Sequence, residues 1–96
     1  MSFEVVIGKK AQAFIDYLQE KDQWIVINTL DRLEESPYPG KGGDKEKLVL
    51  PGGIIAYRIH IGRSYTAFYT IDKEAKLVQI HFEMTIEQAH KKYGYS

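Results

Sequence analysis

The stretch that decides the fold runs from Gly53 to Glu83 and reads GIIAYRIHIGRSYTAFYTIDKEAKLVQIHFE. It contains three runs rich in Ile, Val, Tyr, Phe and Thr, which are separated by GRS at 62–64 and by DKEA at 72–75. Short β-rich runs joined by turns of three or four residues are typical of an antiparallel meander. The stretch therefore predicts three consecutive antiparallel strands at the centre of the fold.

Alternation along the first and third runs predicts one apolar and one polar face, because successive side chains of a strand point to opposite sides. The apolar positions are Ile55, Tyr57, Ile59, Ile61, Val78, Ile80 and Phe82. The polar positions are Arg58, His60, Gln79, His81 and Glu83. We expect Ile55 and Ile59 to be buried and Arg58 to be exposed. The middle run has large side chains at both parities, which predicts a central strand with both faces partly covered.

Upstream of this stretch the sequence predicts one strand and two helices. Residues 3–7 (FEVVI) form a plausible first strand that ends at Gly8. Ala11, Phe14, Ile15 and Leu18 then follow at the spacing of one helical face. Asp22 is a suitable N-cap for a second helix, which Pro37 would stop. The two helices are expected to form a hairpin over one face of the sheet.

Two further segments complete the predicted architecture. The segment from Ser36 to Lys47 is rich in Pro, Gly and Lys and reads as a loop, either a solvated connector or a basic lip beside the sheet. It lacks the spacing of a phosphate-binding loop of the nucleotide-hydrolase kind. After Glu83, the residues from Thr85 to Tyr93 predict a short helix with Thr85 as its N-cap. The predicted fold is α+β, with an N-terminal strand and helical hairpin packed on a C-terminal three-stranded antiparallel meander and a short C-terminal helix.

Length and composition predict a single small domain covering residues 1–96. The chain has no cysteine, which excludes a disulfide framework and a thiolate metal site. No apolar run approaches the ~18 residues that a membrane span needs, and no basic-then-apolar signal pattern opens the chain. We therefore expect a cytoplasmic protein without a membrane partner.

The formal net charge is zero, which argues against binding to nucleic acid through the overall field of the protein. The charge is nevertheless uneven: residues 1–37 carry four Lys/Arg and seven Asp/Glu, whereas residues 38–96 carry nine and six. We expect the lysines at 45 and 47 to bend over the polar face of the meander and to form one electrostatic unit with Arg58. Such a basic face would attract phosphates.

The chain resembles the RelE/ParE toxin superfamily, and the RelE-like members in particular. The likeness rests on SPYP at 36–39, KEKL at 45–48, YRIHIG at 57–62, Tyr65 and FYTID at 68–72, in the order and spacing of the family. With the helix pair included, it covers nearly the whole chain. The resemblance implies a toxin of a toxin–antitoxin pair: a cytoplasmic, ribosome-dependent mRNA endoribonuclease that inhibits translation and is neutralised by an antitoxin protein.

The implied reaction is attack of a ribose 2′-OH on the adjacent phosphate, without a metal or another cofactor. It needs a proton acceptor, cations beside the phosphoryl oxygens and a proton donor for the leaving oxygen. Candidate catalytic residues are Arg58, His60, His81 and His90. Candidate RNA- or phosphate-binding residues are Lys45, Lys47, Arg63 and Tyr65. Each of these residues also has a purely structural interpretation. The histidines could be solvated polar residues of the sheet, and Tyr65 could belong to the core of its strand.

The sequence also departs from the family pattern. His60 replaces the second arginine of an Arg-x-Arg pair, Thr66 stands where the family has an arginine after Tyr65, and no arginine follows Arg63. These absences favour an alternative function: a catalytically weakened or inactive RelE/ParE-like binding module that acts through protein or RNA binding. By contrast, Lys45, Lys47 and Arg58 correspond to cationic residues of the family, and their presence favours the endoribonuclease.

Overall fold

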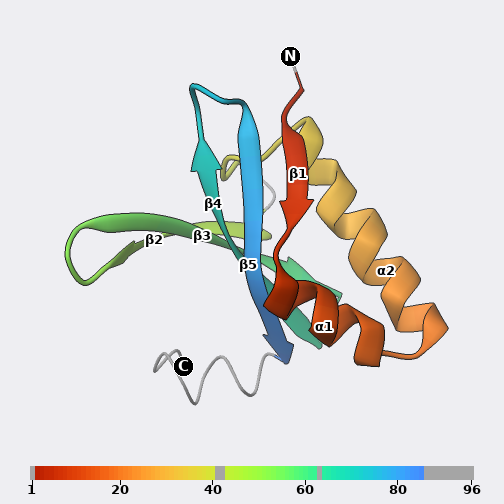
Figure 1. Cartoon of the computed structure of the whole chain (residues 1–96). Helices are drawn as coiled ribbons and strands as arrows, with labels where there is room; N and C mark the ends of the chain where they lie inside the picture. The colour runs from red at the N-terminus through yellow and green to blue at the C-terminus, as the bar shows by residue number, and fades with distance from the viewer. Residues whose placement is uncertain (1, 41–42, 63, 86–96) are drawn as a thin grey trace.

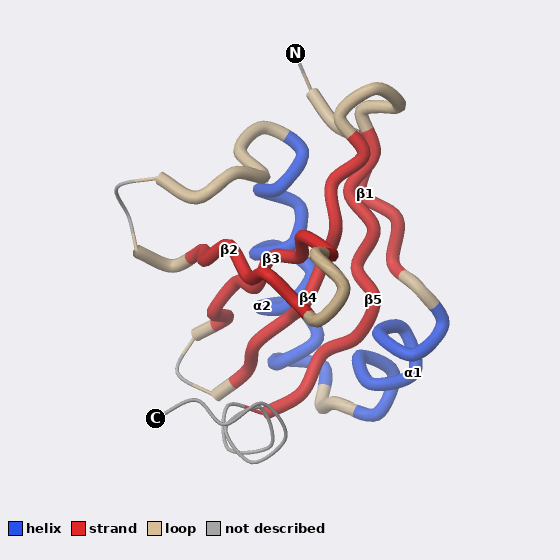
Figure 2. The backbone as a smooth tube through the Cα atoms, turned by 90° about the vertical axis from the view of Figure 1, so that its left-hand side faces the viewer, coloured by secondary structure: helices blue, strands red, loops and turns tan. Residues whose placement is uncertain are grey.

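The computed structural model describes residues 2–40, 43–62 and 64–85, and it describes 82–85 through their backbone alone. In chain order the elements are β1 (Glu4–Ile7), α1 (Lys9–Tyr17), α2 (Glu20–Asp31), a 3₁₀ turn η1 (Arg32–Glu34), β2 (Lys45–Leu50), β3 (Ile54–Ile61), β4 (Tyr65–Asp72) and β5 (Leu77–Thr85). The strands form a five-stranded sheet in the order β1-β5-β4-β3-β2. Both helices lie on one side of it (Figure 1), and Figure 2 views the sheet from the other side, with α2 behind the strands. The predicted α+β class is confirmed.

The hydrophobic core lies between the helix pair and the sheet. Its buried members are Ala11, Ile15, Val26, Leu30, Leu33, Ile59, Ile61, Ala67, Tyr69, Val78 and Ile80. The predicted helical face of α1 is confirmed, since Ala11 and Ile15 are buried. Helix α2 contributes Val26 and Leu30. The periodicity of α1 therefore identified the side that packs on the sheet.

The predicted start of the second helix was wrong by three residues. Helix α2 begins at Glu20, with Gln19 as its N-cap, so that Asp22 lies inside the first turn. An acidic residue there is stabilised by the partial positive charge of the helix N-terminus. The same preference explains why Asp22 looked like a cap in the sequence.

Strand β1 occupies an edge of the sheet and pairs in parallel with β5. The sequence predicted the strand but not its partner, because parallel pairing joins segments that are distant in the chain. The connection from β1 to α1 is tight: the Gly8 backbone N–H donates to the Ile80 carbonyl oxygen at 2.8 Å. A Cβ atom at Gly8 would lie 2.8 Å from that same oxygen. The glycine is thus required by close approach to the neighbouring strand.

Replacing Gly8 with alanine should destabilise the fold by about 1–3 kcal/mol, because the new methyl group must displace backbone of β5. The measurement is the free energy of unfolding from urea titration. Gly40→Ala is the matched control, since no atom lies within 4 Å of the Cβ position at Gly40. Equal effects of the two substitutions would contradict the close packing of β1 on β5.

The sheet contains a fifth strand that the sequence analysis did not predict. Residues 45–47 were assigned to a loop, but Lys45–Leu50 forms β2, which pairs antiparallel with β3. Strand β2 is an edge strand, and edge strands commonly carry charged residues that protect against aggregation. The charges at 45–47 therefore concealed the strand. Gly52 and Gly53, with φ of 86° and 78°, form the turn between the two strands.

The predicted face of β3 is correct over only part of its length. Ile59 is 1% exposed, as expected, but Ile55 is 41% exposed. The hairpin of β2 and β3 extends away from both helices (Figure 1), so this end of β3 has no helix to pack against. Strand β4 confirms the prediction of a doubly covered strand, because the four residues from Thr66 to Tyr69 are all buried.

Strand β5 contains an irregularity that the alternation did not predict. Phe68 of β4 pairs with Phe82, and Tyr69 pairs with Ile80, so His81 has no partner residue across the ladder. This is a β-bulge, which changes the parity of the strand after Ile80. The predicted C-terminal helix and His90 lie outside the described residues, except that Thr85 is the last residue of β5.

Candidate functional site

The side of the sheet opposite the helices, here called the distal face, carries the polar residues predicted from alternation. Its described members are Glu46, Leu48, Leu50, Ile54, Ala56, Arg58, His60, Thr66, Phe68, Thr70, Gln79 and His81. Register places Arg58 opposite Phe68 and His60 opposite Thr66 on this face. Arg58 and His60 are two residues apart on one strand, which puts their Cα atoms about 7 Å apart. The structure therefore brings these two candidates together.

Arg58 is held by a carboxylate from the neighbouring strand. Its Nε donates to Oε2 of Glu46 at 3.0 Å, and its terminal nitrogen donates to the same oxygen. The arginine side chain is 12% exposed, whereas that of Glu46 is 52% exposed. The prediction of an exposed Arg58 was therefore wrong, because the ion pair folds the guanidinium onto the sheet. A phosphate that binds Arg58 has to compete with Glu46, a partner that the sequence analysis missed.

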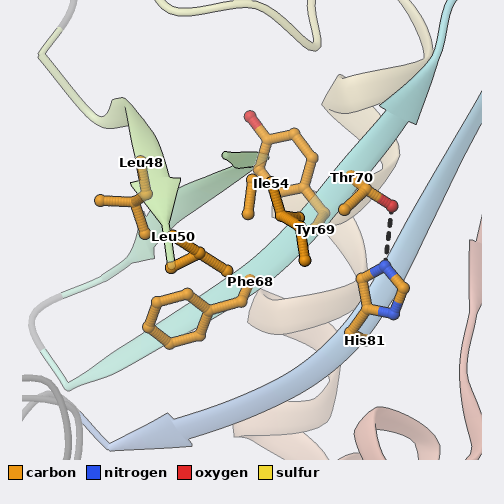
Figure 3. A pocket seen from close by; sticks show the side chains of 8 residues that line it. Leu48, Leu50, Ile54, Phe68, Tyr69, Thr70 and His81 are labelled. Atoms are coloured by element: carbon orange, nitrogen blue, oxygen red, sulfur yellow. Dashed lines mark hydrogen bonds between the residues drawn. The ribbon is translucent and has the colours of Figure 1, made fainter. Parts of the chain in front are cut away.

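His81 stands at the bulge of β5 and contacts a threonine of β4. Its Nε2 and the Thr70 hydroxyl oxygen are 2.7 Å apart. Bulges re-aim side chains and are frequent next to functional sites. Figure 3 shows the imidazole and the hydroxyl at one end of a mainly apolar hollow. Thr70 gave no signal in the sequence, because its contact depends on the bulge.

This apolar hollow has a volume of about 240 Å³. Its lining residues are Leu48, Leu50, Ile54, Ala56, Phe68, Tyr69, Thr70 and His81. They come from β2, β3, β4 and β5, so the hollow requires both hairpins of the sheet (Figure 3). Neither Arg58 nor His60 lines it. The distal face thus has a polar part around Arg58 and His60 and an apolar part next to His81.

The described histidines do not form an acid–base pair. His60 pairs with Thr66, whereas His81 contacts Thr70. Those two threonines are four residues apart on β4, which is about 13 Å along the strand. A single reacting phosphate cannot be reached by both imidazoles at hydrogen-bond distance. His60, beside Arg58, is the better placed of the two for proton transfer at a phosphate held by the arginine.

The lysines of β2 point away from Arg58. Register places Lys45 opposite Ile59 and Lys47 opposite Tyr57, which belong to the side of the sheet that faces the helices. Lys45 Nζ donates to the Ser36 carbonyl oxygen at 3.0 Å. The expectation of one electrostatic unit with Arg58 was wrong, because alternation along β2 puts its lysines and its glutamate on opposite faces.

Tyr65 also belongs to the helix side. Its hydroxyl donates to Oδ2 of Asp22 at 2.8 Å, and its ring meets that of Phe14 edge-on at 5.9 Å. These contacts join β4 to both helices. Base stacking by Tyr65 remains a prediction, and a stacked base would have to leave the contacts with Asp22 and Phe14 in place. Arg63 lies outside the described residues.

Tyr69 and Tyr57 form a stacked pair on the same side, with ring centroids 5.5 Å apart. The Tyr69 hydroxyl donates to the Pro37 carbonyl oxygen at 2.7 Å. Burial raises the pKa of Tyr69 well above its ordinary value, so this hydroxyl stays protonated and keeps its hydrogen bond. The pair therefore ties the loop after η1 to the sheet.

The described ranges contain neither a metal-binding cluster nor a membrane-spanning helix. No group of three or more His, Cys, Asp or Glu side chains there is arranged to hold a metal ion. No helix among the described residues is both long and apolar enough to cross a bilayer.

No family model matches the chain, and no curated protein matches it. Several solved structures, however, are similar to the chain. The archaeal RelE–RelB complex from Pyrococcus horikoshii is similar with 25% identity and a TM-score of 0.73, over 88% of this chain and 96% of that one. The toxin–antitoxin complex RelBE2 from Mycobacterium tuberculosis is similar with 17% identity and a TM-score of 0.73, over 88% and 99%. A mutant of E. coli toxin RelE in the free state is similar with 20% identity and a TM-score of 0.70, over 94% of this chain and 90% of that one. The sequence resemblance is thus confirmed at the level of structure, and the chain has the RelE-like toxin fold.

Proposed function

We propose that this protein is the toxin of a toxin–antitoxin pair and cleaves mRNA on the ribosome. The observation that carries the proposal is the placement of Arg58 and His60 side by side on the distal face of a RelE-like fold. An arginine and an imidazole on one face can serve a single phosphate: the arginine holds the phosphoryl oxygens and the imidazole moves a proton.

In this mechanism the 2′-OH of a ribose attacks the adjacent phosphorus and the bond to the 5′ oxygen breaks. The guanidinium of Arg58 would turn from Glu46 to the phosphoryl oxygens and stabilise their developing charge. His60 would accept the 2′ proton, because an imidazole exchanges protons near neutral pH. The leaving 5′ oxygen takes a proton as its bond to phosphorus breaks, and from the sequence we propose His90 as the donor.

The proposed partners follow from the same similarity. The Pyrococcus horikoshii and Mycobacterium tuberculosis relatives were solved as toxin–antitoxin complexes. We therefore propose an antitoxin protein that binds this chain and silences it. The ribosome and mRNA are proposed as the targets, in the cytoplasm.

The direct test adds the purified protein to ribosomes that carry a defined mRNA and maps 5′ ends by primer extension. Cuts within the ribosomal A site, absent when the same mRNA is free, would support the proposal. Intact mRNA at every protein concentration, with ribosome binding retained, would contradict cleavage.

A second candidate function is supported by the ion pair of Arg58. Glu46 neutralises the charge that the reaction needs, and His60 and His81 are too far apart to share a phosphate. Both features favour the alternative, a binding module with weakened or lost cleavage. In that case the protein would occupy the ribosome or RNA without cutting it.

Glu46→Gln distinguishes the role of this ion pair. The substitution removes the competing carboxylate, so affinity for single-stranded RNA at low salt should rise about two- to fivefold. Affinity should also depend more steeply on salt, by up to ~0.7 in the log–log slope for one added phosphate contact. Fluorescence anisotropy with a labelled RNA at several salt concentrations measures both quantities.

The control is Glu20→Gln, which makes the same charge change at an exposed position in the first turn of α2. An equal rise in affinity for the two variants would show that net charge alone is responsible and that Arg58 does not meet the phosphate.

A further inference from the structure

A second hollow, of about 420 Å³, lies on the helix side of the sheet. We call it the tyrosine hollow, and its lining residues are Tyr38, Lys47, Ile55, Tyr57, Ile71 and Lys73. They come from the loop after η1, from β2, β3 and β4, and from the turn after β4. Its volume is within the range of small-molecule sites, about 300–1,000 Å³.

The aromatic walls of the tyrosine hollow are held in fixed orientations. Tyr57 stacks on the buried Tyr69 at 5.5 Å with 21° between the ring planes. Tyr38 stands edge-on to Tyr57 at 6.2 Å and 87°, and edge-on to Phe3 at 6.1 Å and 77°. Tyr38 is still 40% exposed. The ring of Tyr38 is thus open to solvent while it contacts two aromatic neighbours, and Tyr57 lies beside it.

The charged side chains that line the tyrosine hollow are two lysines. Lys47 and Lys73 are exposed, and neither has an ion pair or hydrogen bond among the described residues. By contrast, Lys45 is bonded to Ser36 and Arg58 to Glu46. Two ammonium groups on one hollow repel each other, so an anion between them is favoured. The aromatic walls and the two lysines together favour a ligand that is flat on one side and anionic on another.

We propose that the tyrosine hollow binds a nucleotide, with its base stacked on the exposed ring of Tyr38 and its phosphate between Lys47 and Lys73. Base–aromatic stacking and Lys–phosphate contacts are the usual components of sequence-tolerant single-strand recognition. The apolar side chains of Ile55 and Ile71 exclude water beneath the base. The nucleotide is either free or one unit of a single-stranded RNA. The site is separate from the distal face and goes beyond the proposed function, because it requires no cleavage.

Titrations followed by NMR of the tyrosine rings and lysine side chains test the proposal. Four probes are compared on the wild-type protein: AMP, adenosine, inorganic phosphate and a short oligoribonucleotide. Ring shifts at Tyr38 and Tyr57 are expected with AMP and with RNA. AMP should bind more tightly than adenosine or phosphate, because it makes both contacts. Saturation by AMP but not RNA identifies the free nucleotide as the ligand, and tighter binding of RNA identifies the strand.

Variants separate the two components. Lys47→Ala with Lys73→Ala should weaken AMP about three- to tenfold, towards the affinity of adenosine. Tyr38→Leu keeps an apolar side chain but removes the ring and should weaken AMP about tenfold, whereas Tyr38→Phe should bind as the wild type does. The charge control is Lys9→Ala with Lys10→Ala, which removes two exposed lysines from α1. Circular dichroism and thermal melting confirm that each variant is folded.

Three outcomes would overturn the proposal. The first is no ring shift with millimolar AMP or with RNA. The second is an equal loss of affinity in the α1 control. The third is saturable binding of AMP without ring shifts at Tyr38 and Tyr57, which would place the nucleotide outside the tyrosine hollow. None of these outcomes depends on mRNA cleavage, so the result is separable from that of the ribosome assay.

Discussion

His60→Ala is expected to lower the rate of mRNA cleavage on the ribosome by about 10²- to 10⁴-fold, the range typical of a lost general base. The reason is its position beside Arg58 on the distal face. Arg58→Ala should lower the rate by about 10²–10³, because it removes a positioned cation from the phosphoryl oxygens. Single-turnover cleavage of ribosome-bound mRNA measures both.

His81→Ala is the matched control, since it removes an imidazole from the same face about 13 Å along the sheet. It should leave cleavage nearly unchanged. Loss of activity in His81→Ala with full activity in His60→Ala would move the reacting phosphate to the bulge of β5. Arg58→Lys adds a second comparison, because it keeps the charge and loses the planar fork.

Leu30→Ala should destabilise the protein by about 2–5 kcal/mol. Leu30 is 1% exposed in the core between α2 and the sheet, so truncation leaves a cavity that neighbouring side chains cannot fill. Chemical denaturation gives the free energy of unfolding.

Trp24→Ala is its control on the same helix. The tryptophan is larger but 70% exposed, so its removal should cost less than about 1 kcal/mol. A larger loss at Trp24 than at Leu30 would mean that the buried face of α2 is assigned incorrectly.

The sequence was sufficient for the parts of the fold that depend on local pattern. Helical spacing identified the buried face of α1, and short β-rich runs identified β3, β4 and β5. Periodicity is a local property, because each helix or strand exposes one side whatever its partners are. Together with the motifs in residues 36–72, these elements were enough to recognise the RelE-like fold.

The sequence was less informative about the site. It placed Arg58 and His60 on one face correctly, since a spacing of two residues on a strand guarantees this. It could not show that Glu46 would hold Arg58, because that contact follows from the register of β2 on β3. The roles of the predicted site residues remain predictions.

Pairing between distant segments was decided by the tertiary structure alone. Strand β2 became visible as a strand through its pairing with β3, and that register sends Lys47 and Arg58 to opposite faces. The bulge at His81 and the exposure of Ile55 likewise depend on neighbours that no local pattern specifies. The physical reason is that alternation determines relative parity within one strand, whereas register and coverage are determined by what packs against it. The chain by itself determined its two helices, the buried face of α1 and four of its five strands, and only the folded sheet decided the strand β2, the exposure of Ile55 and which charged groups meet.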